Sequence, residues 1–214
     1  MELDIQAFLR ETFQIANEEI LRQAEDSGHL EHLKRGELVI EAGEQHQTIA
    51  ILLHGVARGF LLDANGHEIS DCFSSHCGDV LVGCNDIQAP SAINIEAVTE
   101  CDVLQLPTAL VQEWQDRYPE IVSIYNQILK QGLVRHWEAK ICMCSYPAIQ
   151  RYQWFLENYP GLEHVVNSKD IASFLGITPV TLSRLRRQMA IGQSAAVKEH
   201  AGATVQQEGC GGPG

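Results

Sequence analysis

Residues 167–188 read NSKDIASFLGITPVTLSRLRRQ, and this stretch decides the fold of the C-terminal part of the chain. Ser168 is predicted to cap a first short helix, because its hydroxyl can accept a hydrogen bond from a free amide at the helix start. Gly176 stands where that helix must end, since glycine tolerates the left-handed conformation needed there. Thr178 and Pro179 then fit the cap and the first position of a second helix. Two short helices joined by a tight turn that contains glycine are typical of a helix-turn-helix.

Both predicted helices carry apolar residues at helical spacing, which gives each of them a face to bury. In the second helix these residues are Leu182, Leu185 and Met189, and the opposite face carries threonine, serine and arginine. Such a face suits the major groove of DNA, where a guanidinium pairs with guanine and hydroxyls reach bases or phosphates. The alternative interpretation is an ordinary helical hairpin with a solvated basic face.

Charge is unevenly distributed along the 214 residues, whose formal net charge is −13. Residues 1–150 contain 9 Lys and Arg against 23 Asp and Glu, a difference of −14, whereas residues 151–214 contain 6 against 5, a difference of +1. This balance argues against a protein coated in nucleic acid or lying on an anionic membrane. An acidic body with one basic helix fits a regulator that touches DNA only at its tip.

Several classes of protein are not expected from this sequence. No apolar run approaches the roughly 20 residues of a membrane-spanning helix. The N-terminal MELDIQAFLRETF is acidic where a secretory signal is basic, so we expect a cytoplasmic protein with no membrane contact. We also expect no enzyme, because no phosphate loop, nucleophile elbow or paired-carboxylate pattern occurs.

The seven cysteines are expected to be reduced thiols rather than disulfides. Most of them fall in two groups: Cys72, Cys77, Cys84 and Cys101, and then Cys142 and Cys144. Their spacing is a weak metal signal compared with paired CxxC units, and free cysteine is also an ordinary small core residue. We therefore predict no metal and no cofactor, with a metal, cluster or thiol-sensing role as the alternative.

The region before the helix-turn-helix divides into helical and strand-like parts. Residues 1–28 show helical periodicity that ends at Ser27-Gly28. Strands are then predicted at 37–40, 48–53, 56–62, 68–73, 79–82, 92–98 and 102–106. Asn65-Gly66 between two of these runs is a strong hairpin signal. Seven or eight short strands at this spacing indicate an antiparallel β-sandwich or β-roll.

Helical periodicity returns after the strands. Helices are predicted at 108–117, from Pro119 to about Met143, and at 148–158, followed by a turn at 159–161. The long helix carries an apolar stripe made of Val122, Tyr125, Leu129, Leu133, Trp137 and Ile141. A stripe this long can serve the domain's own core and a twin helix in a dimer. The alternative is a helix buried only within its own chain.

The order of these parts resembles the Crp/Fnr family of bacterial transcription regulators over roughly residues 20–190. The strongest likeness is RYQWFLENYPGL (151–162) followed by the stretch 167–188. Weaker marks are LKRGELVIEAGEQ (33–45), ILLHGVARGFLLDANGHE (51–68) and PSAINIEAVTECDVLQL (90–106). The resemblance implies an α+β chain with an N-terminal antiparallel β-roll of the cyclic-nucleotide-binding kind, a long dimerisation helix and a C-terminal all-α helix-turn-helix domain.

We therefore expect the β-roll with its N-terminal helices at 1–107, the dimerisation region at 108–145, the DNA-binding domain at 146–190 and a mobile tail at 191–214. The resemblance further implies a homodimer on a two-fold symmetric operator, with half-sites about 34 Å apart.

The sequence departs from the family pattern in two places. Members that bind a cyclic nucleotide follow a Gly-Glu turn with Arg-Ser-Ala, whereas this chain has Pro90-Ser91-Ala92 at the matching positions. The Gly-Glu turn itself matches Gly78-Asp79, so the candidate effector residues are Gly78, Asp79, Ser91 and Ala92. Without the guanidinium a phosphate lacks its main counter-charge, and we expect that cyclic AMP is not bound. The second departure is that no hairpin wing is evident after Met189.

The resemblance also assigns roles in DNA binding. We predict that Val180, Thr181 and Arg184 reach base edges, with Arg184 pairing a guanine. Phosphate contacts are predicted for Ser168, Thr178, Ser183 and Arg187.

The sequence thus predicts a transcription regulator whose partners are double-stranded DNA and a second copy of the chain, with RNA polymerase and an unknown small-molecule effector as further candidates. Two alternatives stay open: a sensor whose roll binds a small molecule, a metal or a redox signal, and a small β-barrel enzyme.

Overall fold

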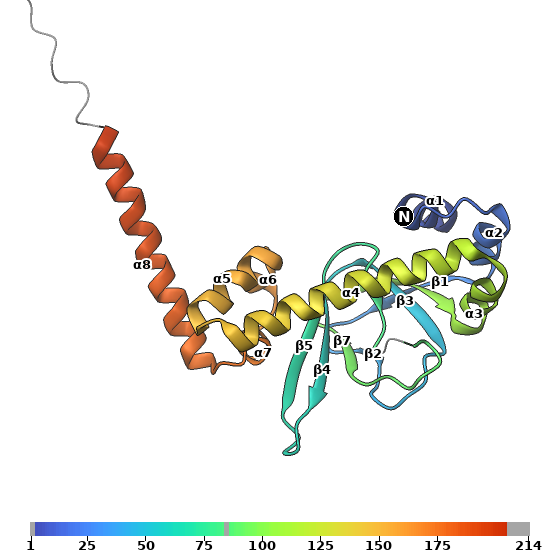
Figure 1. Ribbon diagram of the computed structural model, residues 1–214, viewed down its shortest axis with the longest axis horizontal. Helices are drawn as coiled ribbons and strands as arrows, with labels where there is room; N and C mark the ends of the chain where they lie inside the picture. Colours follow the sequence, from blue (N-terminus) through green and yellow to red (C-terminus); the bar gives the residue numbers. More distant parts are fainter. Residues whose placement is uncertain (1–2, 84–85, 205–214) are drawn as a thin grey trace, which may run out of the picture.

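The computed structural model describes residues 3–83 and 86–204, and from residue 192 onward it describes the backbone only. Figure 1 shows a β-roll at one end, a long helix along its side and a group of helices at the other end. In chain order the elements are α1 (Ile5–Phe13), α2 (Glu18–Ser27), β1 (His29–Leu33), β2 (Leu38–Ile40), β3 (Thr48–His54), β4 (Ala57–Leu62), β5 (Glu68–Ser74), β6 (Val80–Leu81), β7 (Asn94–Ala97), β8 (Cys101–Pro107), α3 (Thr108–Arg117), α4 (Pro119–Ser145), α5 (Ala148–Asn158), α6 (Leu162–Val165), α7 (Ser168–Phe174) and α8 (Pro179–Thr204).

The strands form two four-stranded antiparallel sheets, with the orders β1-β8-β3-β6 and β2-β7-β4-β5. The β4–β5 hairpin turns at Asn65-Gly66, where Gly66 has a φ of 79° and the Asp63 carboxylate accepts from the Asn65 and His67 amides at 2.8 and 2.9 Å. The predicted antiparallel roll and its hairpin are therefore confirmed.

Buried residues form three clusters that follow this layering. One fills the space between the two sheets around Leu52, Ala97 and Val103. A second lies on the outer face of the first sheet, beneath α1, α2, α3 and the start of α4. The third joins the roll to the C-terminal helices. In this third cluster Phe73 of β5 lies 6.1 Å from Phe155 and 5.3 Å from Phe174, measured between ring centroids.

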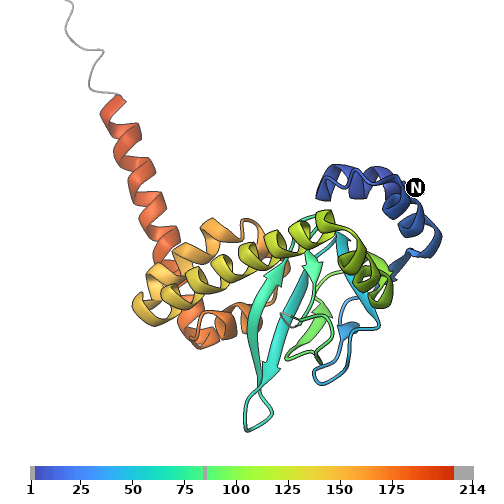
Figure 2. The same cartoon turned by 45° about the vertical axis from the view of Figure 1, so that its right-hand side comes forward.

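The long helix α4 runs from the N-terminal helices to the C-terminal domain (Figures 1 and 2). Its first turns face the roll, where Ile121 is buried and Ile124 is half-buried. The predicted apolar stripe divides between two surfaces. Its residues Tyr125 and Leu129 are half-buried toward the roll, whereas Val122, Leu133, Trp137 and Ile141 are exposed.

Three features differ from the sequence prediction. The predicted helical segment 1–28 is two helices, because Gln14 adopts a φ of 58° and Asn17 caps a new start. Strand β1 was not predicted. Its side chains are mostly exposed, so its sequence shows little apolar pattern, and its pairing with β8 holds it in place.

The third difference concerns the tail. Helix α8 continues through Thr204, into the segment 191–214 that was predicted to be a mobile tail, and residues 205–214 lie outside the described part. Alanine, lysine, glutamate and glutamine in this stretch have high helix propensity, which lets an existing helix extend without an apolar stripe. Among the residues that the structure describes, no helix combines the length and apolar character that a membrane span requires.

Candidate nucleic-acid interface

The turn between α7 and α8 is closed by local hydrogen bonds. Gly176 follows α7 with a φ of 62°, its amide donates to Ser173 O at 3.0 Å, and the Ile177 amide donates to Ala172 O at 3.0 Å. These two bonds satisfy carbonyls at the helix end in the manner of a Schellman motif. Helix α8 then begins at Pro179, and Thr178 Oγ1 accepts from the Thr181 amide at 3.1 Å. The predicted turn and second cap are both confirmed.

Helix α8 buries one face and exposes the other. Leu182 and Leu185 are buried in the cluster that contains Phe155, Ile171 and Leu175. Burying side chains of this size stabilises the domain by roughly 1.5–3 kcal/mol each. The buried apolar face, which includes Leu182 and Leu185, thus anchors α8 and leaves the side chains of the opposite face directed outward.

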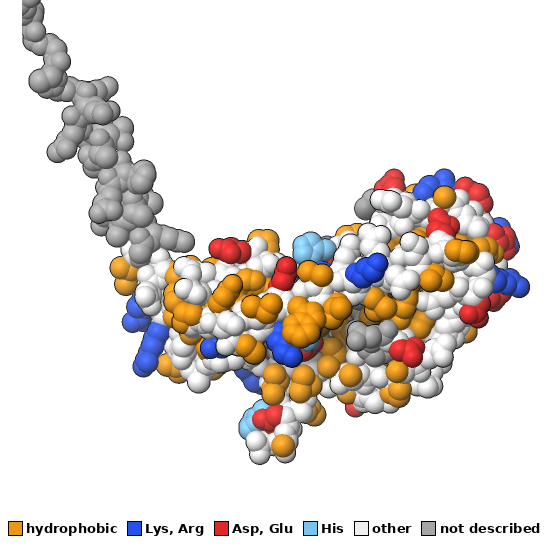
Figure 3. Space-filling view, in the orientation of Figure 1, with side chains coloured by type: hydrophobic (Ala, Val, Ile, Leu, Met, Phe, Trp, Pro, Cys, Tyr) orange, Lys and Arg blue, Asp and Glu red, His pale blue; other side chains and the backbone are white. Residues whose placement is uncertain are grey.

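The outer face of α8 carries a shallow hollow lined by Pro179, Val180, Ser183, Arg184 and Arg187. Val180, Ser183 and both arginines are exposed. Neither arginine has an ion-pair or hydrogen-bond partner among the described side chains. Figure 3 shows Lys and Arg side chains gathered near the beginning of α8, at the end of the molecule away from the roll. The structure therefore brings these predicted DNA-binding residues onto one accessible surface.

Two residues that were predicted to contact phosphates, Ser168 and Thr178, also have hydrogen-bond partners within the protein. The N-cap of α7 is Asn167, one residue before the predicted Ser168, and its carbonyl accepts from the Asp170 and Ile171 amides. Ser168 is the first residue of α7 rather than its cap, and its hydroxyl accepts from Arg186 Nη1 at 2.8 Å. Thr178 Oγ1 also lies 2.9 Å from Thr181 Oγ1, so both threonine hydroxyls serve the start of α8.

Arg186 is a positioning residue that the sequence prediction left without a role. Its Nε donates to the Tyr152 hydroxyl at 3.3 Å and its Nη2 to Glu163 O at 3.5 Å, besides the bond to Ser168. The guanidinium thus holds α5, α6 and α7 against α8. The sequence position of Arg186 could have indicated this role, because residue 186 lies one helical turn after Leu182 and therefore borders the buried face of α8.

The hydrogen-bond donors of the candidate effector residues already donate to carbonyl oxygens within the protein. The amides of Gly78, Asp79, Ser91 and Ala92 donate to Leu52 O, His76 O, Glu44 O and Gly83 O at 2.8, 3.0, 2.8 and 2.9 Å. The Ser91 hydroxyl donates to Ile93 O at 2.6 Å. The Asp79 carboxylate accepts from the Ser75 and His76 amides at 3.0 Å and lies 3.5 Å from Arg135 Nη1. These four residues consequently have no backbone amide or hydroxyl to spare for an anion.

No protein-family model matches the sequence, and no curated protein was found to match it. Solved structures do resemble it. FixK2 from Bradyrhizobium japonicum aligns over 78% of this chain and 86% of its own with a TM-score of 0.71 and 16% identity. A protein from Eubacterium rectale assigned to the Crp/Fnr family aligns over 82% and 84% with a TM-score of 0.66 and 16% identity. The c-di-GMP-responsive regulator CLP from Xanthomonas campestris aligns over 83% and 93% with a TM-score of 0.66 and 11% identity.

The chain has the Crp/Fnr fold. At these identities the likeness establishes the architecture and leaves the activity to be argued from the chain's own residues. The order of roll, long helix and helix-turn-helix matches the predicted order. Within the described residues, helix α8 occupies positions 179–204 and no strand follows β8.

Cysteines lie at several depths in this Crp/Fnr fold. Burial raises the pKa of Cys72 to about 12, and it also raises the pKa of Cys101, which is itself buried and donates to Val56 O at 3.3 Å. Cys77 and Cys144 are exposed, while Cys84 lies outside the described residues. Within the described part of the chain, no group of three or more His, Cys, Asp or Glu is placed to hold a metal ion.

Proposed function

We propose that this protein is a sequence-specific DNA-binding transcription regulator that acts as a homodimer through its helix-turn-helix. The observation that carries the proposal is the outer face of α8, where Arg184 and Arg187 are exposed and unpaired among the described side chains while Leu182 and Leu185 anchor the helix. A helix held this way can enter the major groove without rearranging the domain.

The assignment of contacts follows from which side chains are free. Arg184, Val180 and Ser183 line the exposed hollow, so we place Arg184 at a guanine and Val180 at a thymine methyl group. Arg187 and Ser183 are placed at phosphates. Thr178, Thr181 and Ser168 have internal partners, so any contact they make to DNA must be shared with those hydrogen bonds.

The exposed part of α4 supports the homodimer. Every residue from 130 to 138 is exposed, and this stretch includes Leu133, Val134 and Trp137, which are 57%, 54% and 51% exposed. Ile141, one turn later, is 52% exposed. Contiguous apolar surface on a helix is typical of an interaction site, and a second α4 supplies a matching apolar stripe. Two helix-turn-helix units related by a two-fold axis would then reach successive major grooves.

The effector domain is proposed to be degenerate toward cyclic nucleotides. The position of the family's phosphate-binding arginine holds Pro90, and the donors of Gly78, Asp79, Ser91 and Ala92 are engaged within the chain. RNA polymerase remains a proposed partner, the cytoplasm the proposed location, and no enzymatic activity is proposed.

Selection of genomic DNA fragments by the purified full chain tests the proposal. We expect enrichment of a two-fold symmetric motif, and the same selection with Arg184→Ala should lose it. Enrichment of fragments without a shared motif, or identical enrichment by Arg184→Ala, would overturn sequence-specific binding through α8. The homodimer is tested separately by solution scattering, where a persistent monomer would refute it.

A further inference from the structure

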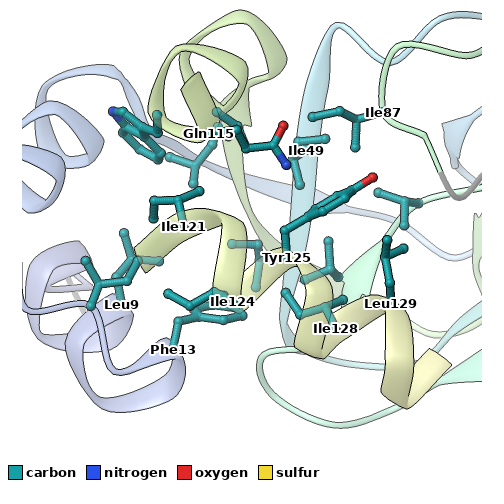
Figure 4. Close-up of a pocket in the computed structure, with 17 residues that line it drawn as sticks. Leu9, Phe13, Ile49, Ile87, Gln115, Ile121, Ile124, Tyr125, Ile128 and Leu129 are labelled. Carbon is teal, nitrogen blue, oxygen red and sulfur yellow. The ribbon is translucent and has the colours of Figure 1, made fainter. Parts of the chain in front are cut away.

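An apolar cavity lies between the outer face of the first sheet and the helices that cover it. Its wall is built from α1, strands β3, β6 and β8 of the first sheet, α3 and the first half of α4, together with the loop residues Val82 and Ile87. Figure 4 shows side chains from these elements, among them Ile49, Ile124 and Ile128, directed toward one common space. The cavity volume is about 100 Å³.

The wall is almost entirely hydrocarbon. Apart from Gln115 and the hydroxyl end of Tyr125, the described residues that line it are aliphatic or aromatic, and none is charged. The indole of Trp114 also lines the cavity, but its Nε1 donates to Gln23 Oε1 at 2.7 Å and is thereby satisfied elsewhere. A wall of this kind favours an uncharged apolar molecule and penalises a charged one, because a buried ion needs a paired charge.

The cavity is separate from the other surfaces that α4 presents. Ile124, Ile128 and Leu129 are half-buried toward the roll, whereas Leu133 and Trp137 belong to the exposed stripe assigned to a second copy. None of the candidate effector residues Gly78, Asp79, Ser91 and Ala92 lines it. A partner copy on the exposed stripe and an anion in the roll therefore both leave this space unfilled.

We propose that this cavity binds an uncharged apolar molecule about the size of toluene. The volume of about 100 Å³ is smaller than that of an apolar cavity of about 150 Å³ that binds benzene, so side chains of the wall must move apart to admit a single ring. The ring would contact Ile49 on the sheet and Ile124 and Ile128 on the helix. Ligand binding would thus strengthen the packing of α4 on the roll.

This site gives the proposed regulator an input of a different chemical class from a cyclic nucleotide. Ile121, Ile124, Ile128 and Leu129 precede the exposed stretch 130–138 on the same helix. A ligand that orders this half of α4 can therefore bias the half that is assigned to dimerisation. This regulatory consequence rests on the proposed function, whereas binding of the ligand does not.

Titration of the purified full chain with toluene, followed by calorimetry and by thermal unfolding, tests the site. Toluene is expected to bind saturably, with a negative heat-capacity change, and to raise Tm. Sodium benzoate has nearly the same shape and one negative charge, and it should bind at least about a hundredfold more weakly. This comparison uses the unaltered protein and needs no variant to fold.

A filled-cavity variant locates the binding. Ile128→Phe should reduce toluene affinity at least about tenfold, because the added ring occupies the cavity. Leu62→Phe is the matched control, since Leu62 is exposed on the β4–β5 hairpin away from the cavity, and it should keep full affinity. Absence of saturable toluene binding, equal affinity for benzoate, or unchanged affinity in a folded Ile128→Phe would each overturn the proposal. Toluene binding by a protein that selects no DNA motif would refute the proposed function alone.

Discussion

The Nη1 atom of Arg58 in β4 lies 2.5 Å from Oδ1 of Asp170 in α7, so a buried ion pair joins the roll to the helix-turn-helix. Arg58 is 2% exposed and also pairs with Glu96 at 2.6 Å and Glu68 at 2.8 Å. Burial raises the pKa of Asp170, while Arg58 acts in the opposite direction. One guanidinium thus holds strands β4, β5 and β7 of the second sheet and helix α7 together.

Removing this cation should strongly destabilise the protein. Arg58→Met is expected to lower the free energy of unfolding by about 3–5 kcal/mol, because it leaves Asp170 buried without its counter-charge. Urea unfolding measures the loss. Arg22→Met is the matched control, since Arg22 pairs with Glu19 and Asp26 at the surface, where solvent screens the charges, and it should cost far less stability. Equal losses in the two variants would contradict the role assigned to Arg58.

Arg184 and Arg187 should differ in what they contribute to DNA binding. Arg184→Ala is expected to lower affinity for the operator by about 1–3 kcal/mol and to leave affinity for random DNA nearly unchanged. Arg187→Ala should weaken both and reduce the salt dependence by about one phosphate contact. Binding isotherms on the two DNAs at several salt concentrations separate these effects. A uniform loss with Arg184→Ala would mean that this arginine does not read bases.

A charge among the exposed apolar residues of α4 should dissociate the proposed dimer. Trp137→Asp is expected to give a monomer in analytical ultracentrifugation, because it places an unpaired carboxylate in an apolar interface. Val165→Asp is the matched control on α6, where the valine is 44% exposed outside the stripe, and it should remain dimeric. A dimeric Trp137→Asp would show that another surface mediates association.

Stability should fall on mild acidification because of His46. This side chain is buried, its Nε2 accepts from the Gly83 amide at 3.4 Å, and burial lowers its pKa from 6.5. The unfolded chain therefore binds the proton more readily than the folded one. The stabilisation that His46 contributes is complete above pH 6.5 and is lost as the pH falls through the folded-state value.

His46→Gln keeps an acceptor and should flatten the decline below pH 6.5 in urea unfolding. His32 is the opposite case, since Asp102 at 2.8 Å raises its pKa and its contribution is lost as the pH rises above 6.5. His32→Gln should therefore lower stability below pH 6.5 and remove the part of the decline above pH 6.5 that His32 causes. An unchanged acidic side in His46→Gln would remove His46 as the cause.

The parts of the structure that the sequence predicted are those set by neighbours in the chain. Gly176, Thr178 and Pro179 determine the turn of the helix-turn-helix within four positions, and Asn65-Gly66 determines a hairpin within two. Helix α5 begins and ends where its apolar period and flanking turn indicated. Helix caps, glycine conformations and side-chain periods act over a few residues, so they can be read from one sequence.

The tertiary structure decided everything that depends on distant residues meeting. Arg58 and Asp170 are 112 positions apart, and β1 is held by its pairing with β8, whose residue Asp102 lies 70 positions from His32. Serine is a residue type that often caps helices, yet the Ser168 hydroxyl accepts from Arg186, because the packing of α8 brings the guanidinium next to this hydroxyl. Such contacts depend on how sheets and helices stack, and residue order alone does not specify which side chains of two packed surfaces will meet.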